Sequence, residues 1–166
     1  MSKVLGDTDE YCTLVFDQSR MTASFGTTTL STVLLTGEYI DYRKILPASF
    51  RTTALADRVG VQNAIDRASL MAREGKNNLI RMSFSGDTLA ISSNAELGDV
   101  LEELETELTG DPIEIAFNAK YIIDVIRNIT DEKLCMRFNS NVSPCVIAPQ
   151  EREDYLYLIL PVRVFT

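Results

Sequence analysis

The sequence predicts an α+β fold in which two helices pack on antiparallel β-sheets, with a partial second copy of the same module near the N-terminus. Three observations support this prediction. Two segments repeat apolar residues at helical spacing, several short segments alternate apolar and polar residues, and one order of strands occurs twice. With 166 residues, the chain has room for one complete domain and a small or incomplete second one.

The repeat begins with a shared tripeptide. Thr8-Asp9-Glu10 recurs as Thr130-Asp131-Glu132, an offset of 131 − 9 = 122 residues. After each copy come an apolar strand ending in Phe, a turn, a second strand, a polar loop and a third apolar strand. A tripeptide alone arises by chance, but the shared strand order indicates a true repeat. The expected strands are residues 12–16, 21–25 and 30–35 in the first copy and 134–138, 144–148 and 156–162 in the second.

Residues 48–130 precede the second copy and have no counterpart before residue 8. We therefore expect residues 1–46 to be the incomplete back half of one domain with its linker, and residues 47–166 to be a complete domain. A chain that begins in the middle of a domain leaves strand edges and an apolar face uncovered.

Two helices are expected in the complete domain. Asp57 can cap the first, and Gly75 with Asn77 and Asn78 gives a plausible stop. The second starts at Asn118. The residues expected on the inner sides are Val61, Ala64, Ile65, Ala68, Met71 and Ala72 in the first helix, and Tyr121, Ile122, Val125, Ile126 and Ile129 in the second.

Strands are expected at residues 79–84, 88–92 and 113–117. Residues 100–108 are ambiguous, because their composition favours a helix. However, apolar residues and Thr106 alternate there with glutamates, and Gly110-Asp111-Pro112 breaks the chain before the next strand. We therefore predict a strand.

Composition argues against several classes of protein. The chain has 24 acidic residues, 16 basic residues and no histidine, which gives a net charge of −8. Without histidine, the commonest general base and the usual zinc ligand are both missing, so we expect no enzyme, metal or cofactor. The negative charge argues against tight binding of nucleic acid through its phosphates.

Other features indicate a cytoplasmic protein. No stretch approaches the roughly 20 apolar residues of a membrane span, and residues 1–10 lack the pattern of a signal peptide. Cys12, Cys135 and Cys145 are odd in number and share no CxxC spacing, so reduced and mostly packed thiols are expected.

Two sets of charged residues can be explained as solvent-exposed surface from the sequence alone. The carboxylates from Glu102 to Glu107 could hold a divalent metal, but on an alternating strand they form a solvated edge that deters aggregation. The cations on or near the polar sides of the two helices are typical of solvated helix surface. They are Arg58, Arg67, Arg73 and Lys76 for the first helix, and Lys120 and Arg127 for the second.

The last ten residues form an apolar segment that contains Pro161 and Arg163. Most termini are polar and frayed, so this segment is either buried as a final strand or lines a groove. Together with residues 41–47 and 117–121, it resembles the C-terminal part of the bacterial DNA polymerase III beta subunit, the replication sliding clamp. The resemblance covers nearly the whole chain and is firmest over residues 36–47 and 110–164.

The resemblance implies a sliding-clamp (DNA clamp) fold and a non-catalytic processivity factor of DNA replication. Such a clamp is a ring-shaped homodimer that encircles duplex DNA. It binds the replicative polymerase alpha subunit, the clamp loader and repair polymerases through short linear motifs, and we expect no membrane association. Residues 1–46 would then belong to the middle clamp domain and residues 47–166 to the last one.

The resemblance also implies three sets of site residues. Arg58, Arg67, Arg73 and Arg127 would face DNA, and Leu70, Met71, Glu96, Asp99 and Glu102 would form one side of the ring joint. A hydrophobic cleft would bind partner peptides. Its expected residues are Ile40, Lys44, Ile45, Asn118, Tyr121, Val142, Pro144, Leu158, Ile159, Leu160, Pro161, Val162, Arg163 and Val164.

Two departures from the family pattern bear on this cleft. The chain lacks the front half of the middle domain, so one subsite is expected to be incomplete, and Phe165 and Thr166 extend past the usual end. Two other functions stay open from the residues alone. One is a generic α+β peptide-binding module outside replication, and the other is a metal-dependent hydrolase that uses the carboxylates from Glu102 to Glu107.

Overall fold

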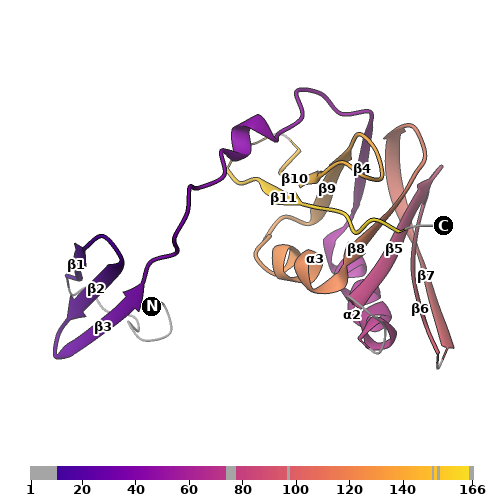
Figure 1. Ribbon diagram of the computed structural model, residues 1–166. Helices are drawn as coiled ribbons and strands as arrows, with labels where there is room; N and C mark the ends of the chain where they lie inside the picture. Colours follow the sequence, from indigo (N-terminus) through magenta and orange to yellow (C-terminus); the bar gives the residue numbers. More distant parts are fainter. Residues whose placement is uncertain (1–10, 74–77, 97, 151, 153, 165–166) are drawn as a thin grey trace. The chain divides into compact units, whose positions relative to one another are not determined.

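The computed structural model describes residues 11–73, 78–96, 98–150, 152 and 154–164. The chain divides into two compact units, Met1–Tyr42 and Arg43–Thr166, which we call unit 1 and unit 2 (Figure 1). A short 3-10 helix, η1 (Tyr42–Lys44), spans the boundary between the units.

Unit 1 contains an antiparallel sheet of three strands, β1 (Thr13–Phe16), β2 (Arg20–Phe25) and β3 (Thr28–Val33). The expected strands are therefore confirmed, but no polar loop separates the last two. Gly26 and Thr27 alone connect them, and the φ of 51° at Gly26 is one that glycine adopts without strain. The tripeptide Thr8-Asp9-Glu10 lies outside the described residues.

Unit 2 forms one antiparallel sheet with the strand order β11-β10-β9-β4-β7-β6-β5-β8. Two helices pack on this sheet, so the predicted fold class is confirmed. The elements are β4 (Thr52–Asp57), α2 (Arg58–Ala72), β5 (Leu79–Ser85), β6 (Thr88–Ala95), β7 (Gly98–Gly110), β8 (Ile113–Asn118), α3 (Ala119–Ile126), β9 (Lys133–Phe138), β10 (Cys145–Ile147) and β11 (Tyr157–Ile159).

The ambiguous segment is strand β7, which confirms the prediction. Its first part pairs with β6 as far as Glu105, and its last part pairs with β4 from Thr106 to Gly110. One strand thus joins the two halves of the sheet. Gly110 has a φ of 101°, and a Cβ there would lie 1.9 Å from the carbonyl oxygen of Arg51, so only glycine fits this crossing.

Each helix directly follows a strand and is capped by an Asx side chain. Asp57 Oδ2 accepts from the Gly60 N–H at 2.6 Å, and Asn118 Oδ1 accepts from the Lys120 N–H at 3.0 Å. Three strands follow each helix, so unit 2 repeats the order β-α-β-β-β. The first helix ends at Ala72, and the expected stop at Gly75 and Asn77 lies outside the described residues.

The core lies between the helices and the sheet. The inner side of α2 is as predicted, except that Met71 is only partly buried. For α3, the prediction of Tyr121 on the inner side is wrong, because its side chain is 59% exposed. The buried stripe of this short helix is Ala119, Ile122, Ile123 and Ile126, and position 121 is rotated away from it.

Strand β4 was not expected from the sequence. Its buried side chains are small, namely Thr52, Ala54 and Ala56, so the segment lacks the strong apolar alternation that indicates a strand.

Cys135 and Cys145 are buried free thiols and Cys12 is partly exposed, in keeping with mostly packed cysteines. Burial raises the pKa of Cys145. No helix within the described residues is long and apolar enough to cross a membrane.

Candidate functional site

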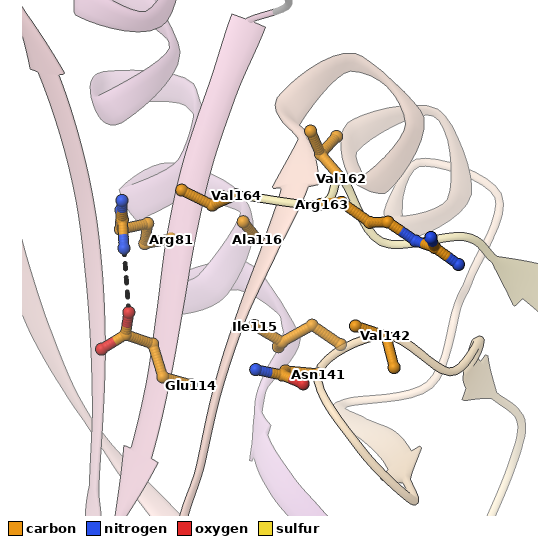
Figure 2. Close-up of a pocket in the computed structure, with 9 residues that line it drawn as sticks. All are labelled: Arg81, Glu114, Ile115, Ala116, Asn141, Val142, Val162, Arg163 and Val164. Atoms are coloured by element: carbon orange, nitrogen blue, oxygen red, sulfur yellow. Dashed lines mark hydrogen bonds and ion pairs between the residues drawn. The ribbon is translucent and has the colours of Figure 1, made fainter. Parts of the chain in front are cut away.

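A groove of about 520 Å³ lies where the segment after β11 crosses β8 (Figure 2). We call residues 160–164 the tail segment. The Val162 N–H donates to the Ala116 carbonyl at 2.8 Å, which holds the tail segment against β8. The groove is lined by Arg81 of β5, by Glu114, Ile115 and Ala116 of β8, by Asn141 and Val142 of the β9–β10 loop, and by Val162, Arg163 and Val164.

The groove has apolar walls and charged ends. Val142 is 57% exposed and comes from the loop, whereas Val162 comes from the tail segment. Across the pair of strands β5 and β8, Arg81 Nη1 lies 3.0 Å from Glu114 Oε1, and Figure 2 shows the Arg163 side chain pointing away from this pair. An apolar ligand side chain can be buried against the valines while the charges orient its polar flanks.

Four of the expected cleft residues line this groove: Val142, Val162, Arg163 and Val164. Ile45, Tyr121 and Leu160 are exposed apolar side chains of unit 2 outside its lining. Lys44 is also exposed, and Asn118, Pro144, Leu158 and Pro161 are partly buried. Ile40 belongs to unit 1, whereas every residue that lines the groove belongs to unit 2.

Ile159 does not belong to the groove surface. Its side chain is buried in the core cluster, because β11 points alternate residues to opposite faces of the sheet. The structure adds Arg81, Glu114, Ile115, Ala116 and Asn141, which sequence reasoning missed. Only the pairing of the tail segment with β8 brings these residues beside the terminal valines, and no local pattern indicates that pairing. Phe165 and Thr166 lie outside the described residues.

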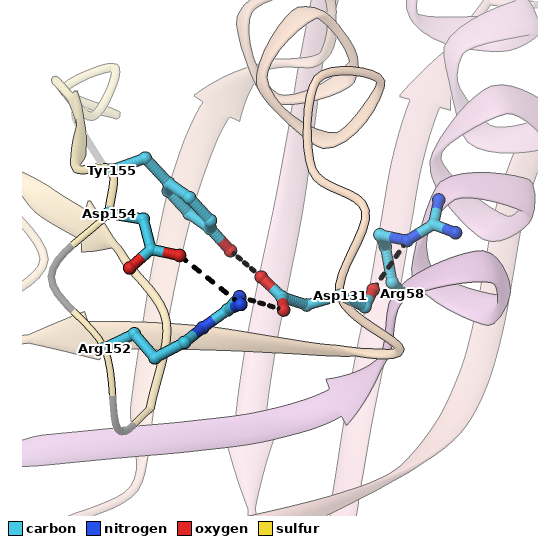
Figure 3. Close-up of polar contacts among 5 residues, drawn as sticks. All are labelled: Arg58, Asp131, Arg152, Asp154 and Tyr155. Atoms are coloured by element: carbon cyan, nitrogen blue, oxygen red, sulfur yellow. Dashed lines mark hydrogen bonds and ion pairs between the residues drawn. The ribbon is translucent and has the colours of Figure 1, made fainter.

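A polar cluster around Asp131 holds the loop that leads into β11 (Figure 3). Its Oδ2 accepts from the Tyr155 hydroxyl at 2.6 Å, and its Oδ1 pairs with Arg152, which also lies 3.3 Å from Asp154. The Asp131 carbonyl accepts from Arg58 Nε at 2.8 Å. Burial, together with the hydrogen bond to the carboxylate, raises the pKa of Tyr155, so its hydroxyl stays protonated and donating.

The arginines expected to face DNA do not form a single free patch. Arg58 is engaged by Asp131, and Arg67 makes two hydrogen bonds of 2.7 Å to the Glu102 carboxylate. These bonds raise the pKa of Arg67 and lower that of Glu102. Arg73 and Arg127 do lie together, in a cavity of about 260 Å³ between α2 and α3 that Lys120 also lines. Asp66, 3.8 Å from Arg127, and Asp124, which also lines the cavity, offset part of this charge.

The residues expected at a ring joint lie on two neighbouring parts of unit 2. Leu70 is exposed and Met71 partly buried in the last turn of α2. Glu96 and Asp99 are exposed where β6 turns into β7, and Asn94 donates to the Asp99 carboxylate. Glu102 lies further along β7, and its pair with Arg67 joins the strand to α2.

The carboxylates of β7 do not converge. Glu103, Glu105 and Glu107 point outward and are exposed, whereas Glu102 faces α2. Glu107 pairs with Lys133. Among the residues that the structure describes, no group of three or more acidic or thiol side chains could hold a metal ion. Nothing in this geometry favours the metal-dependent hydrolase.

Comparison with known proteins gives a consistent set of matches. The family described as "DNA polymerase III beta subunit, C-terminal domain" matches residues 43–163. The beta sliding clamp of Staphylococcus aureus is 30% identical over 167 residues, which is 99% of this chain and 44% of that protein. This chain thus spans less than half the length of the curated relatives it matches.

Solved structures are similar over both units. The DNA polymerase III subunit beta of Pseudomonas aeruginosa has a TM-score of 0.84 at 26% identity, over 98% of this chain and 45% of that one. The DNA polymerase III beta subunit of Eubacterium rectale has a TM-score of 0.82 at 28% identity, over 96% of this chain and 43% of that one.

Proposed function

Because this chain belongs to the DNA polymerase III beta-subunit family, we propose that it is the C-terminal part of a non-catalytic sliding clamp. The family match over residues 43–163 carries the proposal. In the full-length protein, the clamp encircles duplex DNA in the cytoplasm as a homodimeric ring and increases the processivity of replication. Residues 1–46 are the back half of its middle domain and residues 47–166 its last domain.

The groove beside the tail segment is the proposed attachment point for partner proteins. The replicative polymerase, the clamp loader and repair polymerases each insert a short linear motif with apolar anchors. Supporting this role, Val142, Val162 and Val164 are apolar and at least partly accessible, and Arg163 adds a charge at the mouth. Motifs of this kind bind with micromolar affinity, about −8 kcal/mol, through a few anchors.

Calorimetric titration with eight-residue peptides that carry Leu and Phe anchors tests this function. Val142→Asp places an unpaired charge in the groove and should weaken binding at least about tenfold, the equivalent of 1.4 kcal/mol. Val59→Asp is the matched control, because Val59 is a similarly exposed valine on α2, outside the groove. Equal loss of affinity in both variants would contradict the assignment.

Two further experiments address the same site. Deletion of residues 160–166 should abolish peptide binding, whereas deletion of Phe165 and Thr166 alone should leave it intact or improve it. Griselimycin, which is bound in a solved structure of the Pseudomonas aeruginosa sliding clamp, is an independent probe. If neither the peptides nor griselimycin binds unit 2, the proposed function is wrong.

The two helices are the proposed DNA-facing surface. Arg73, Lys120 and Arg127 support it, because they lie together between α2 and α3. With a net charge of −8, the isolated chain should bind duplex DNA poorly at physiological salt, since a clamp holds DNA by enclosing it. Replacing Arg67 and Arg73 with Glu in the full-length clamp should reduce processive synthesis.

A further inference from the structure

Strand β8 is an end strand of the unit 2 sheet and has one open edge. On its inner side β8 pairs with β5 from Ile113 to Asn118. On its outer side, the only backbone bond among the described residues is the one from the Val162 N–H to the Ala116 carbonyl. Beyond that bond, toward the start of β8, the edge has no backbone partner among those residues. Such an edge is a template for another extended chain.

The antiparallel pairing of β8 with β5 shows which backbone N–H and C=O groups of β8 point toward its open edge. In an antiparallel pair, the N–H and C=O of one residue point to the same side, and the side alternates along the strand. The Ala116 carbonyl points outward, because it accepts from the tail segment. Glu114, two residues earlier, therefore also directs its N–H and C=O outward. Neither group has a partner among the described residues.

Space for a ligand backbone runs along this edge. The groove of about 520 Å³ begins at the tail segment, and a second cavity of about 360 Å³ continues toward Asp111. The two cavities share Glu114 and Asn141, so they adjoin at the outward-facing residue of β8. In Figure 2, the β9–β10 loop with Asn141 and Val142 lies across from β8 on this side. The free edge therefore faces open volume.

We propose that the partner peptide adds to β8 as an extended edge strand, paired through the backbone of Glu114. This inference rests on the proposed function and specifies how the ligand is held. Strand addition draws affinity from main-chain hydrogen bonds and specificity from alternate side chains. Here the alternate side chains of the ligand meet the apolar wall of Val142 and Val162, and the intervening ones face solvent. The site selects segments that lack Pro at the paired positions.

A pair of substitutions at one position separates backbone pairing from side-chain effects. Glu114→Pro removes the outward N–H and is sterically tolerated, because Pro is accepted in edge strands where the N–H faces away from the sheet. Glu114→Gln keeps the N–H and removes only the charge that pairs with Arg81. Calorimetry with the anchor peptides should show binding about five- to tenfold weaker for Glu114→Pro, the effect of one lost hydrogen bond. Glu114→Gln should bind within about twofold of the parent chain.

A second measurement needs no protein variant. Methylating the peptide backbone nitrogens one at a time should weaken binding at every second position, since only alternate N–H groups of an added strand point toward β8. Equal binding by Glu114→Pro and Glu114→Gln, or methylation effects without this alternation, would overturn strand addition. If strand addition fails but the peptides still shift the amide NMR signals of Val142 and Val162, the proposed function stands.

Two other outcomes also decide the question. If the chain alone forms dimers that Glu114→Pro disrupts while peptide affinity is unchanged, a second copy occupies the edge and the proposal is wrong. If no anchor peptide binds at all, the proposed function fails and the strand addition fails with it. Amide spectra of Glu114→Pro would show whether its fold is retained. If it does not fold, the methylation series on the parent chain gives the answer.

Discussion

Units 1 and 2 contain the same meander of three antiparallel strands, yet they bury it differently. Phe138 of β9 is 1% exposed, whereas Phe16 of β1, its counterpart at the repeat offset (138 − 16 = 122), is 62% exposed. The difference lies in the neighbours. Strand β4 pairs with β9 along its whole length, but no described strand occupies the outer edge of β1. Local sequence is thus sufficient for the three strands of each meander, while their burial depends on what packs against them.

The connections between strands also differ. In unit 1, Gly26 and Thr27 alone join β2 to β3. In unit 2, residues 148–156 join β10 to β11, and Asp131 ties this longer loop to the start of β9 through Arg152 and Tyr155. A two-residue turn needs no such anchor. The Asp131 cluster therefore compensates for the length of the loop that delivers the tail segment to β8.

The largest contrast between the units should be seen at the repeated phenylalanines. Phe138→Ala should destabilise unit 2 by about 3–5 kcal/mol, the cost of a cavity in a packed core. Phe16→Ala should change the stability of unit 1 by about 0.5 kcal/mol or less, as for an exposed side chain. Urea unfolding followed by amide signals from each unit would measure both. Comparable losses would show that something covers β1 as β4 covers β9.

A smaller effect is expected at the anchored loop. Asp131→Asn removes a charge-assisted pair and should cost unit 2 about 1–2 kcal/mol. Asp154→Asn is the control, since Asp154 is an exposed residue that forms an ion pair of 3.3 Å with Arg152, and losing this charge should cost less than about 0.5 kcal/mol. Thermal unfolding of the three proteins would compare them. A larger loss for Asp154→Asn would contradict the role given to Asp131.

Much of the fold follows from the sequence for identifiable reasons. Asp57 and Asn118 are strong caps before apolar periodic segments, so both helix starts were predictable. The alternation around Thr106 was sufficient to identify β7 despite its helix-forming residues. By contrast, β4 buries only small side chains, so its sequence lacks the apolar alternation that predicts a strand.

The site was less predictable than the fold. The terminal valines were singled out because a terminus is rarely so apolar. Arg81 and Glu114 enter the groove only through the pairing of β5 with β8 and the crossing of the tail segment, which are long-range contacts. The pairing of Arg67 with Glu102 was missed for the same reason, since 35 residues separate them. Local patterns carry no information on such contacts.

The smallest effect concerns the ion pair between Arg67 and Glu102 in unit 2. The Arg67 hydrogen bonds lower the pKa of Glu102 below its ordinary value of 4.5. A lowered folded-state pKa adds stability above pH 4.5, and this contribution is lost as the pH falls through the folded-state value. Carboxyl NMR titration should show the low pKa in the parent chain and an ordinary one in Arg67→Gln. Identical titrations would show that the pair does not persist in solution.

The central claim is that the site for partner peptides lies on unit 2 and not on unit 1. Peptide titration followed by amide chemical shifts tests this claim most directly. Adding an anchor peptide to the labelled chain should shift signals of Val142, Val162 and Arg163 with a micromolar midpoint and leave β1 and β2 unmoved. Shifts confined to the acidic strand β7, with Tyr121 and Val162 unmoved, would contradict the account.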